Sequence, residues 1–154
     1  MENQQEKIIE LLGDLVQINN DRIEGYRKAV DQTKDADLKA LFNRMIDDSQ
    51  AFASQLNAQI GQLGGTGETG TTVSGKLYRT WMDVKATFTG SDRQSILSAC
   101  EYGEDAAQQA YREALKSDTP MPYGIRELIA TQQSTLKNSH DTIKTYRDVE
   151  KVSH

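Results

Sequence analysis

The chain has 154 residues, a length that suits one domain, 1–154, with a hydrophobic core of its own. Its 23 acidic and 18 basic residues are spread along the sequence and give a net charge of −5, without the basic patch that nucleic-acid binding requires. The single Cys100 excludes an intramolecular disulfide, and neither a signal peptide nor an apolar run of about 20 residues is visible. We therefore expect a soluble, cytoplasmic protein that neither binds nucleic acid nor inserts into a membrane.

Two long amphipathic helices are expected in the first 63 residues, because apolar side chains recur there at steps of three and four. The first covers residues 6–30, and two polar residues, Asn19 and Arg22, interrupt its inward face at the middle. The second covers residues 38–63, with Ser49 at its midpoint. The short link between them predicts an antiparallel hairpin.

Residues 91–117 and 123–150 predict a second helical pair, separated by a turn that holds the only two prolines. The third helix has a face of mostly small side chains, with Glu104 on its margin: Ile96, Cys100, Gly103, Ala107, Ala110 and Ala114. The fourth helix has a more polar inward face, with Gln133 on its edge: Ile125, Ile129, Gln132, Leu136, His140, Ile143 and Arg147.

A crossover of about residues 64–90 joins the two pairs. It begins with the loop GGTGETGTT, and the spacing of Leu77, Trp81, Val84 and Phe88 then predicts a short extra helix. Two helical hairpins joined by a long crossover is the connection of ferritin-like bundles. The fold class expected is therefore all-α, a ferritin-like four-helix bundle.

Five stretches carry a resemblance to a known family: INNDRIEGYRKA, DADLKALF, SGKLYRTWMDVKATFTG, CEYGEDAAQQAY and NSHDTIKTYRD. Together they resemble an uncharacterised bacterial family of ferritin-like four-helix-bundle proteins, classed as a domain of unknown function. The resemblance implies the fold and a bacterial cytoplasmic setting, and the wider superfamily suggests a stress-related role. In that superfamily, a di-metal site takes one glutamate from each of two helices and a Glu-x-x-His pair from each of the others.

The residues of this chain do not complete such a site. Metal ligands in a bundle must point inward at one height near its middle. The first helix presents Asn19 and Arg22 there, the second presents Ser49 and Phe52, and the third presents at most Glu104. The fourth helix presents amides at this height. We therefore expect no complete di-metal centre and no catalytic residues.

These inward polar residues predict a polar layer at the middle of the core instead. Buried polar groups without partners cost about 1–3 kcal/mol each, so they should hydrogen-bond to one another, with Arg22 and Glu104 as a charge pair. We interpret the layer as a device that fixes helix register. Its expected members are Asn19, Arg22, Ser49, Glu104, Gln132 and Gln133.

Three hypotheses for function remain open. The favoured one is a non-enzymatic structural or interaction protein, without a cofactor, that acts as a homodimer or with a protein partner. The second is a degenerate ferritin-like site in which Glu104 and His140 hold a single iron or zinc ion. The third is a small-ligand binder that uses a cavity left by Gly103, Ala107 and Ala110.

Overall fold

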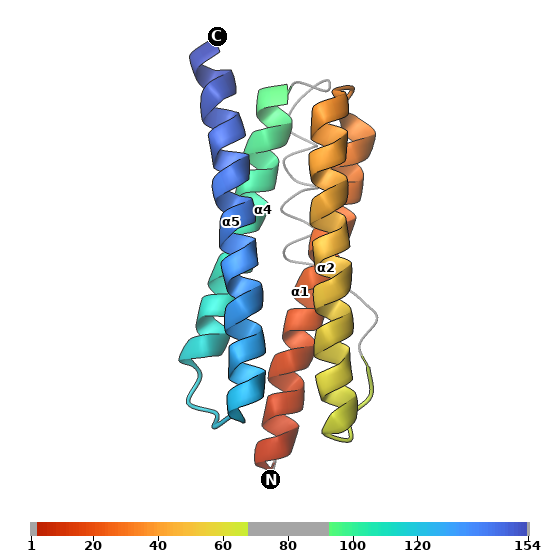
Figure 1. The fold of residues 1–154 in the computed structure, drawn as a ribbon, viewed down its shortest axis with the longest axis vertical. Coiled ribbons are helices and arrows are strands. Elements are labelled where there is room, and N and C mark those ends of the chain that lie inside the picture. Colours follow the sequence, from red (N-terminus) through yellow and green to blue (C-terminus); the bar gives the residue numbers. More distant parts are fainter. Residues whose placement is uncertain (1–2, 68–92, 154) are drawn as a thin grey trace.

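The computed structural model describes residues 3–67 and 93–153, which form four long helices lying side by side (Figure 1). The helices are α1 (Gln4–Gln32), α2 (Ala36–Gln62), α4 (Arg93–Lys116) and α5 (Tyr123–Ser153). One antiparallel hairpin is formed by α1 and α2, and a second by α4 and α5. The predicted all-α bundle of two hairpins is confirmed. The short helix expected around Trp81 lies outside the described residues.

The last helix of the first hairpin and the first helix of the second hairpin are parallel to each other. In Figure 1, α2 ends at the bottom of the view, which we call the foot of the bundle, and α4 begins at the top, which we call its head. The two helices therefore run in the same direction. The end of α2 and the start of α4 therefore lie at opposite ends of the bundle, as do the helices on either side of the crossover in ferritin-like bundles. None of the described helices is both long enough and apolar enough to cross a membrane.

The ends of the helices are set by local hydrogen bonds. The Asn3 side chain caps α1 by accepting a 2.8 Å hydrogen bond from the backbone N–H of Glu6. After α2, Gly64 adopts a φ of 87°, a left-handed conformation that glycine favours and that stops the helix. Asp35 occupies the N-cap position of α2, but its side chain accepts no capping hydrogen bond and instead pairs with Arg93 at 3.0 Å.

The core consists of two apolar clusters, one toward each end of the bundle. The cluster at the head includes Ile23, Leu38, Leu41, Phe42, Ile96, Leu97 and Ile143. The cluster at the foot includes Ile8, Leu12, Leu15, Leu56, Ile60, Ile129 and Leu136. Along α1 and α2, buried polar side chains separate the two clusters, so that the middle of the bundle differs chemically from both ends.

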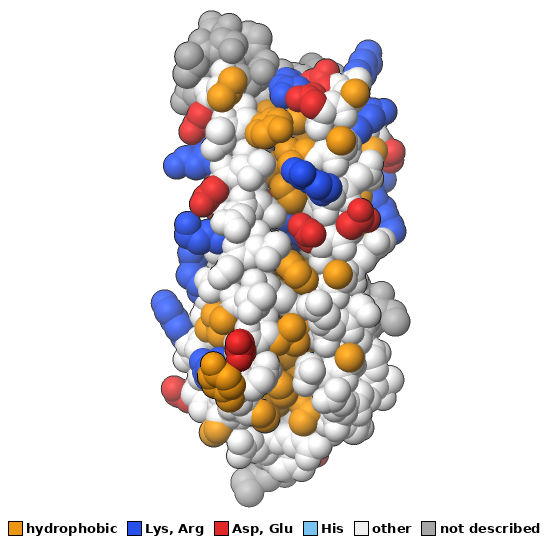
Figure 2. Space-filling model, in the orientation of Figure 1, with side chains coloured by type: hydrophobic (Ala, Val, Ile, Leu, Met, Phe, Trp, Pro, Cys, Tyr) orange, Lys and Arg blue, Asp and Glu red, His pale blue; other side chains and the backbone are white. Residues whose placement is uncertain are grey.

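Figure 2 shows the face of the molecule on which α5 and α2 lie. Hydrophobic side chains gather along the line between these two helices, and Lys, Arg, Asp and Glu side chains flank them. Phe52 of α2 and Leu128 of α5 are both half-buried against the cluster at the foot of the bundle.

Candidate functional site: a polar network at the waist of the bundle

A buried charge pair lies at the middle of the core. The Arg22 side chain is fully buried, and its Nε lies 2.6 Å from Oε1 of the equally buried Glu104. The guanidinium also donates to the Met45 carbonyl at 3.0 Å and to the Ser49 hydroxyl at 2.7 Å. The Tyr26 hydroxyl donates to the same Glu104 oxygen at 2.7 Å, and its ring lies 5.1 Å from the guanidinium carbon. Three helices thus converge on one cation and one carboxylate.

The network continues from this pair toward the foot of the bundle. Ser49 donates to Oδ1 of Asn19 at 2.9 Å, and Asn19 donates through Nδ2 to the Tyr111 hydroxyl at 2.8 Å. Tyr111 in turn donates to Oε1 of Gln132 at 2.7 Å, and Gln132 donates to the Gln55 side chain at 3.0 Å. The chain of hydrogen bonds therefore crosses from α1 through α2 and α4 to α5 and back to α2.

We call this set the waist network. Its members are Asn19, Arg22, Tyr26, Ser49, Glu104, Tyr111 and Gln132. Each of their side chains is at least 99% buried. Because hydrogen bonds between buried groups replace those that the groups made with water, the network removes most of the penalty of placing them in the core.

The electrostatics of the waist network follow from burial and from the charge pair. Burial alone would lower the pKa of Arg22, but the charge of Glu104 and its hydrogen bond raise that pKa above its usual value. Burial and the neighbouring Glu104 charge raise the pKa of Tyr26 well above normal, and burial also raises that of Tyr111. Both tyrosines are therefore neutral donors, and Arg22 stays charged.

One polar atom of the network is not hydrogen-bonded within the described part of the chain. This atom is Oε2 of Glu104, which is buried. The other oxygen, Oε1, already accepts from both Arg22 and Tyr26. A single carboxylate, with one oxygen engaged by a cation, is thus what the waist network offers to any ligand at this level.

The other positions considered from the sequence lie as follows. Gln133 is half-buried, and its backbone carbonyl accepts a 3.2 Å hydrogen bond from Gln108, while its side chain makes no hydrogen bond to the network among the described residues. His140 lies 2.6 Å from Asp105. Glu104 contacts Arg22 in the core, and the potential metal ligands close to His140 are Glu101 and Asp105.

The small-residue face of α4 is packed into the bundle. Cys100 and Ala107 are fully buried in the cluster at the head, Gly103 is buried, and Ala110 is half-buried. From α4, which contacts both α1 and α5, Glu104 reaches Arg22 of α1.

Comparison with known proteins places the chain in a family. Residues 7–117 match the family described as domain of unknown function DUF2383. The chain belongs to this family. No curated protein matches the DUF2383 chain by sequence.

Three solved structures share the fold of this DUF2383 protein. A mutant of Dps1 from Mycobacterium smegmatis has a TM-score of 0.79 at 13% identity, covering 96% of this chain and 99% of that one. A dodecameric, bacterioferritin-related thioferritin from Bacteroides fragilis gives 0.76 at 14%, covering 97% and 89%. A ferritin-like, diiron-carboxylate protein from Bacillus anthracis gives 0.66 at 16%, covering 97% and 99%. At these identities the likeness shows a ferritin-like fold and nothing of the chemistry.

Two members of the waist network were not expected from the sequence. Tyr26 and Tyr111 fall on or beside the inward faces of α1 and α4, where an aromatic ring is an ordinary core residue. The signal that could have found them is their hydroxyl group, because a buried Tyr O–H usually has a hydrogen-bond partner. In this DUF2383 protein, those two hydroxyls link Glu104 to α1 and Asn19 to Gln132.

Proposed function

We propose that this DUF2383 protein is a ferritin-like bundle that works without a di-iron centre, as a non-enzymatic structural or interaction protein. The observation that carries the proposal is the buried guanidinium of Arg22, hydrogen-bonded to Glu104 at the middle of the core. A ferritin-like di-metal site fills that part of the bundle with four glutamates and two histidines.

The donor set of the waist network does not fit a di-iron centre. Asn19, Ser49 and Gln132 supply amides and a hydroxyl where carboxylates and imidazoles would be needed, and their hydrogen-bonding groups are engaged with one another and with Tyr111. The one carboxylate, Glu104, is neutralised by Arg22. A fixed cation at this place repels metal ions, because the one carboxylate of the waist network is already paired with it.

The test is to load the full-length protein with Fe(II) and measure the bound iron and the rate of oxygen consumption. We expect no pair of irons per chain at the waist and no oxidation of Fe(II) above the rate in buffer. Glu104→Gln serves as the diagnostic variant, and we expect it to leave the iron content unchanged. Two irons per chain that are lost in Glu104→Gln would overturn the proposal.

We infer that the protein acts through contacts of its surface with other protein chains. Support comes from the hydrophobic side chains along the line between α5 and α2 (Figure 2), because apolar surface of this kind marks interaction sites when it is contiguous. The thioferritin of Bacteroides fragilis, which shares the fold, is dodecameric. We expect self-association of this chain as a homodimer or a larger assembly.

Light scattering coupled to gel filtration, across a hundredfold range of protein concentration, measures this directly. A mass above that of one 17.2 kDa chain is expected at the highest concentration. A monomer throughout would remove self-association and restrict the proposal to a different protein partner.

A further inference from the structure

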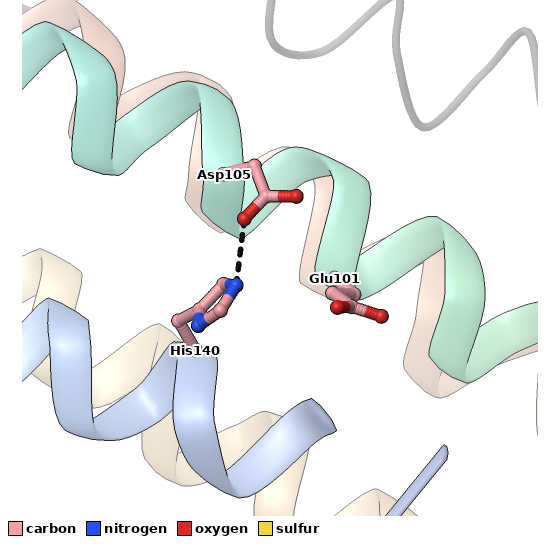
Figure 3. Close-up of side chains that lie close together, drawn as sticks. All are labelled: Glu101, Asp105 and His140. Carbon is pink, nitrogen blue, oxygen red and sulfur yellow. Dashed lines mark ion pairs between the residues drawn. The ribbon is translucent and has the colours of Figure 1, made fainter. Parts of the chain in front are cut away.

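A second group of polar side chains lies where α4 and α5 contact each other, apart from the waist network. Glu101 and Asp105 are four residues apart on α4 and therefore share a face of that helix. His140 of α5 lies opposite them (Figure 3). One potential ligand atom from each of the three lies within 4.8 Å of the other two. We call this group the α4–α5 cluster.

The two ring nitrogens of His140 both face carboxylates. Nδ1 lies 3.1 Å from Oδ1 of Asp141, and Nε2 lies 2.6 Å from Oδ1 of Asp105. A neutral imidazole donates through one nitrogen only, so one of these two contacts needs an additional proton or a metal ion. Histidine ligands of metals typically donate their other N–H to a carboxylate, which fixes the ring and its tautomer. Asp141 is placed to do this for His140, which leaves Nε2 to bind.

We propose that Glu101, Asp105 and His140 bind one divalent first-row transition-metal ion. One imidazole and two carboxylates are the mixed nitrogen and oxygen donors that ions such as Zn²⁺ or Fe²⁺ take in proteins. With metal–ligand bonds of about 2.0–2.2 Å, a tetrahedral ion holds its ligand atoms about 3.4 Å apart. The separations in the α4–α5 cluster range from 2.6 Å to at most 4.8 Å, so side-chain rotations alone can reach that spacing. Three protein ligands leave a fourth position for water.

The charges around the cluster favour a cation. Arg147 contacts Glu101 through Oε2, which leaves Oε1 to turn toward the ion. Arg147 is also held by Asp148 at 3.0 Å, and Lys137 by Asp141 at 3.2 Å. The ion pairs at and beside the cluster contain four carboxylates and two basic side chains. They are Glu101, Asp105, Asp141 and Asp148, against Lys137 and Arg147.

This inference does not rest on the function proposed above. Glu104 is the neighbour of Asp105 in sequence, but it is turned by about 100° around α4 and contacts Arg22 in the core. Metal bound at the α4–α5 cluster would leave the waist network intact. The two proposals can therefore fail separately. Loss of metal in Asp105→Asn or His140→Asn reports on the α4–α5 cluster, and loss of metal in Glu104→Gln reports on the waist network.

The experiment is a calorimetric titration of Zn²⁺ into the full-length protein after treatment with a chelator and its removal. We expect one Zn²⁺ per chain. Asp105→Asn and His140→Asn should each weaken binding at least about tenfold, and Asp141→Asn about tenfold, as for lost outer-shell partners of metal ligands. The matched control is Glu113→Gln, an exposed carboxylate on the same helix, which should bind as the wild type does.

A second measurement uses Co²⁺, whose visible absorption reports on its ligands. We expect bands in the wild type that Asp105→Asn and His140→Asn lose while circular dichroism shows unchanged helicity, since the side chain of Asp105 is 61% exposed. No binding of Zn²⁺ or Co²⁺ to the wild type would overturn the proposal. Binding that persists in both variants, or that only Glu104→Gln removes, would also overturn it.

Discussion

Glu104→Gln tests how much the buried charge pair contributes to the stability of the bundle. The amide keeps an acceptor for Arg22 and Tyr26 but removes the negative charge that lies 2.6 Å from the guanidinium. Because both side chains are fully buried, the remaining cation has little solvent to compensate it. Breaking a buried ion pair in this way costs about 3–5 kcal/mol. Because the Gln amide oxygen can still accept these hydrogen bonds, we expect a loss of stability at the lower end of this range, about 3 kcal/mol.

Urea unfolding followed by circular dichroism measures this cost. With an m value of about 2 kcal/mol/M, the midpoint should fall by about 1.5 M. The double variant Arg22→Met with Glu104→Gln should recover much of the loss, because it no longer buries an unbalanced charge.

Glu24→Gln is the matched control, because Glu24 pairs with Arg27 at 2.7 Å on the surface. Loss of this exposed pair should lower the free energy of unfolding by less than about 1 kcal/mol. A midpoint for Glu104→Gln that falls no further than that of Glu24→Gln would refute this reasoning.

Three further predictions concern the same architecture. The pKa values of Tyr26 and Tyr111 are raised in the folded protein, so as the pH rises the two tyrosines lose their protons first in the unfolded chain, near the ordinary tyrosine pKa of about 10. The free energy of unfolding should therefore fall above that pH, by up to about 1.4 kcal/mol per pH unit for each tyrosine. Urea midpoints between pH 8 and 11 check this, and a flat profile would contradict it. Tyr111→Phe breaks the link between Asn19 and Gln132 and should cost about 1–3 kcal/mol at pH 7, whereas Tyr102→Phe at an exposed position should be neutral; equal midpoints for the two would count against the network. Arg93→Ala removes partly exposed ion pairs and should cost at most about 1 kcal/mol, a difference that shrinks in 1 M NaCl; a larger, salt-independent loss would show that Arg93 acts otherwise.

The polar pair at the waist was within reach of sequence reasoning because it depends only on helical phase and on height. In a long, uninterrupted helix each residue advances by about 100°, so Arg22 and Glu104 could each be assigned to an inward position. The antiparallel hairpins then bring the middles of all four helices to one level. The hydrogen-bonding partners of a tyrosine cannot be obtained in this way, since phase places Tyr111 in the core without saying where its hydroxyl points.

The α4–α5 cluster shows the limit of the same reasoning. The helical phase of a residue predicts only whether its side chain faces the axis of the bundle, and Glu101 and Asp105 fall outside the inward face of α4. Two adjacent helices also contact each other beside their inward faces, and there Asp105 of α4 reaches His140 of α5. Contacts of these kinds depend on how neighbouring segments pack, which the periodicity of one helix does not contain.

The most direct test of the central claim is a crystal structure of the full-length protein after anaerobic soaking in Fe(II), with data collected at the iron absorption edge. We predict no anomalous density at the waist between Arg22 and Glu104, and an intact hydrogen bond between them. A pair of iron peaks at that level, with Glu104 turned away from Arg22 to bind them, would contradict the account.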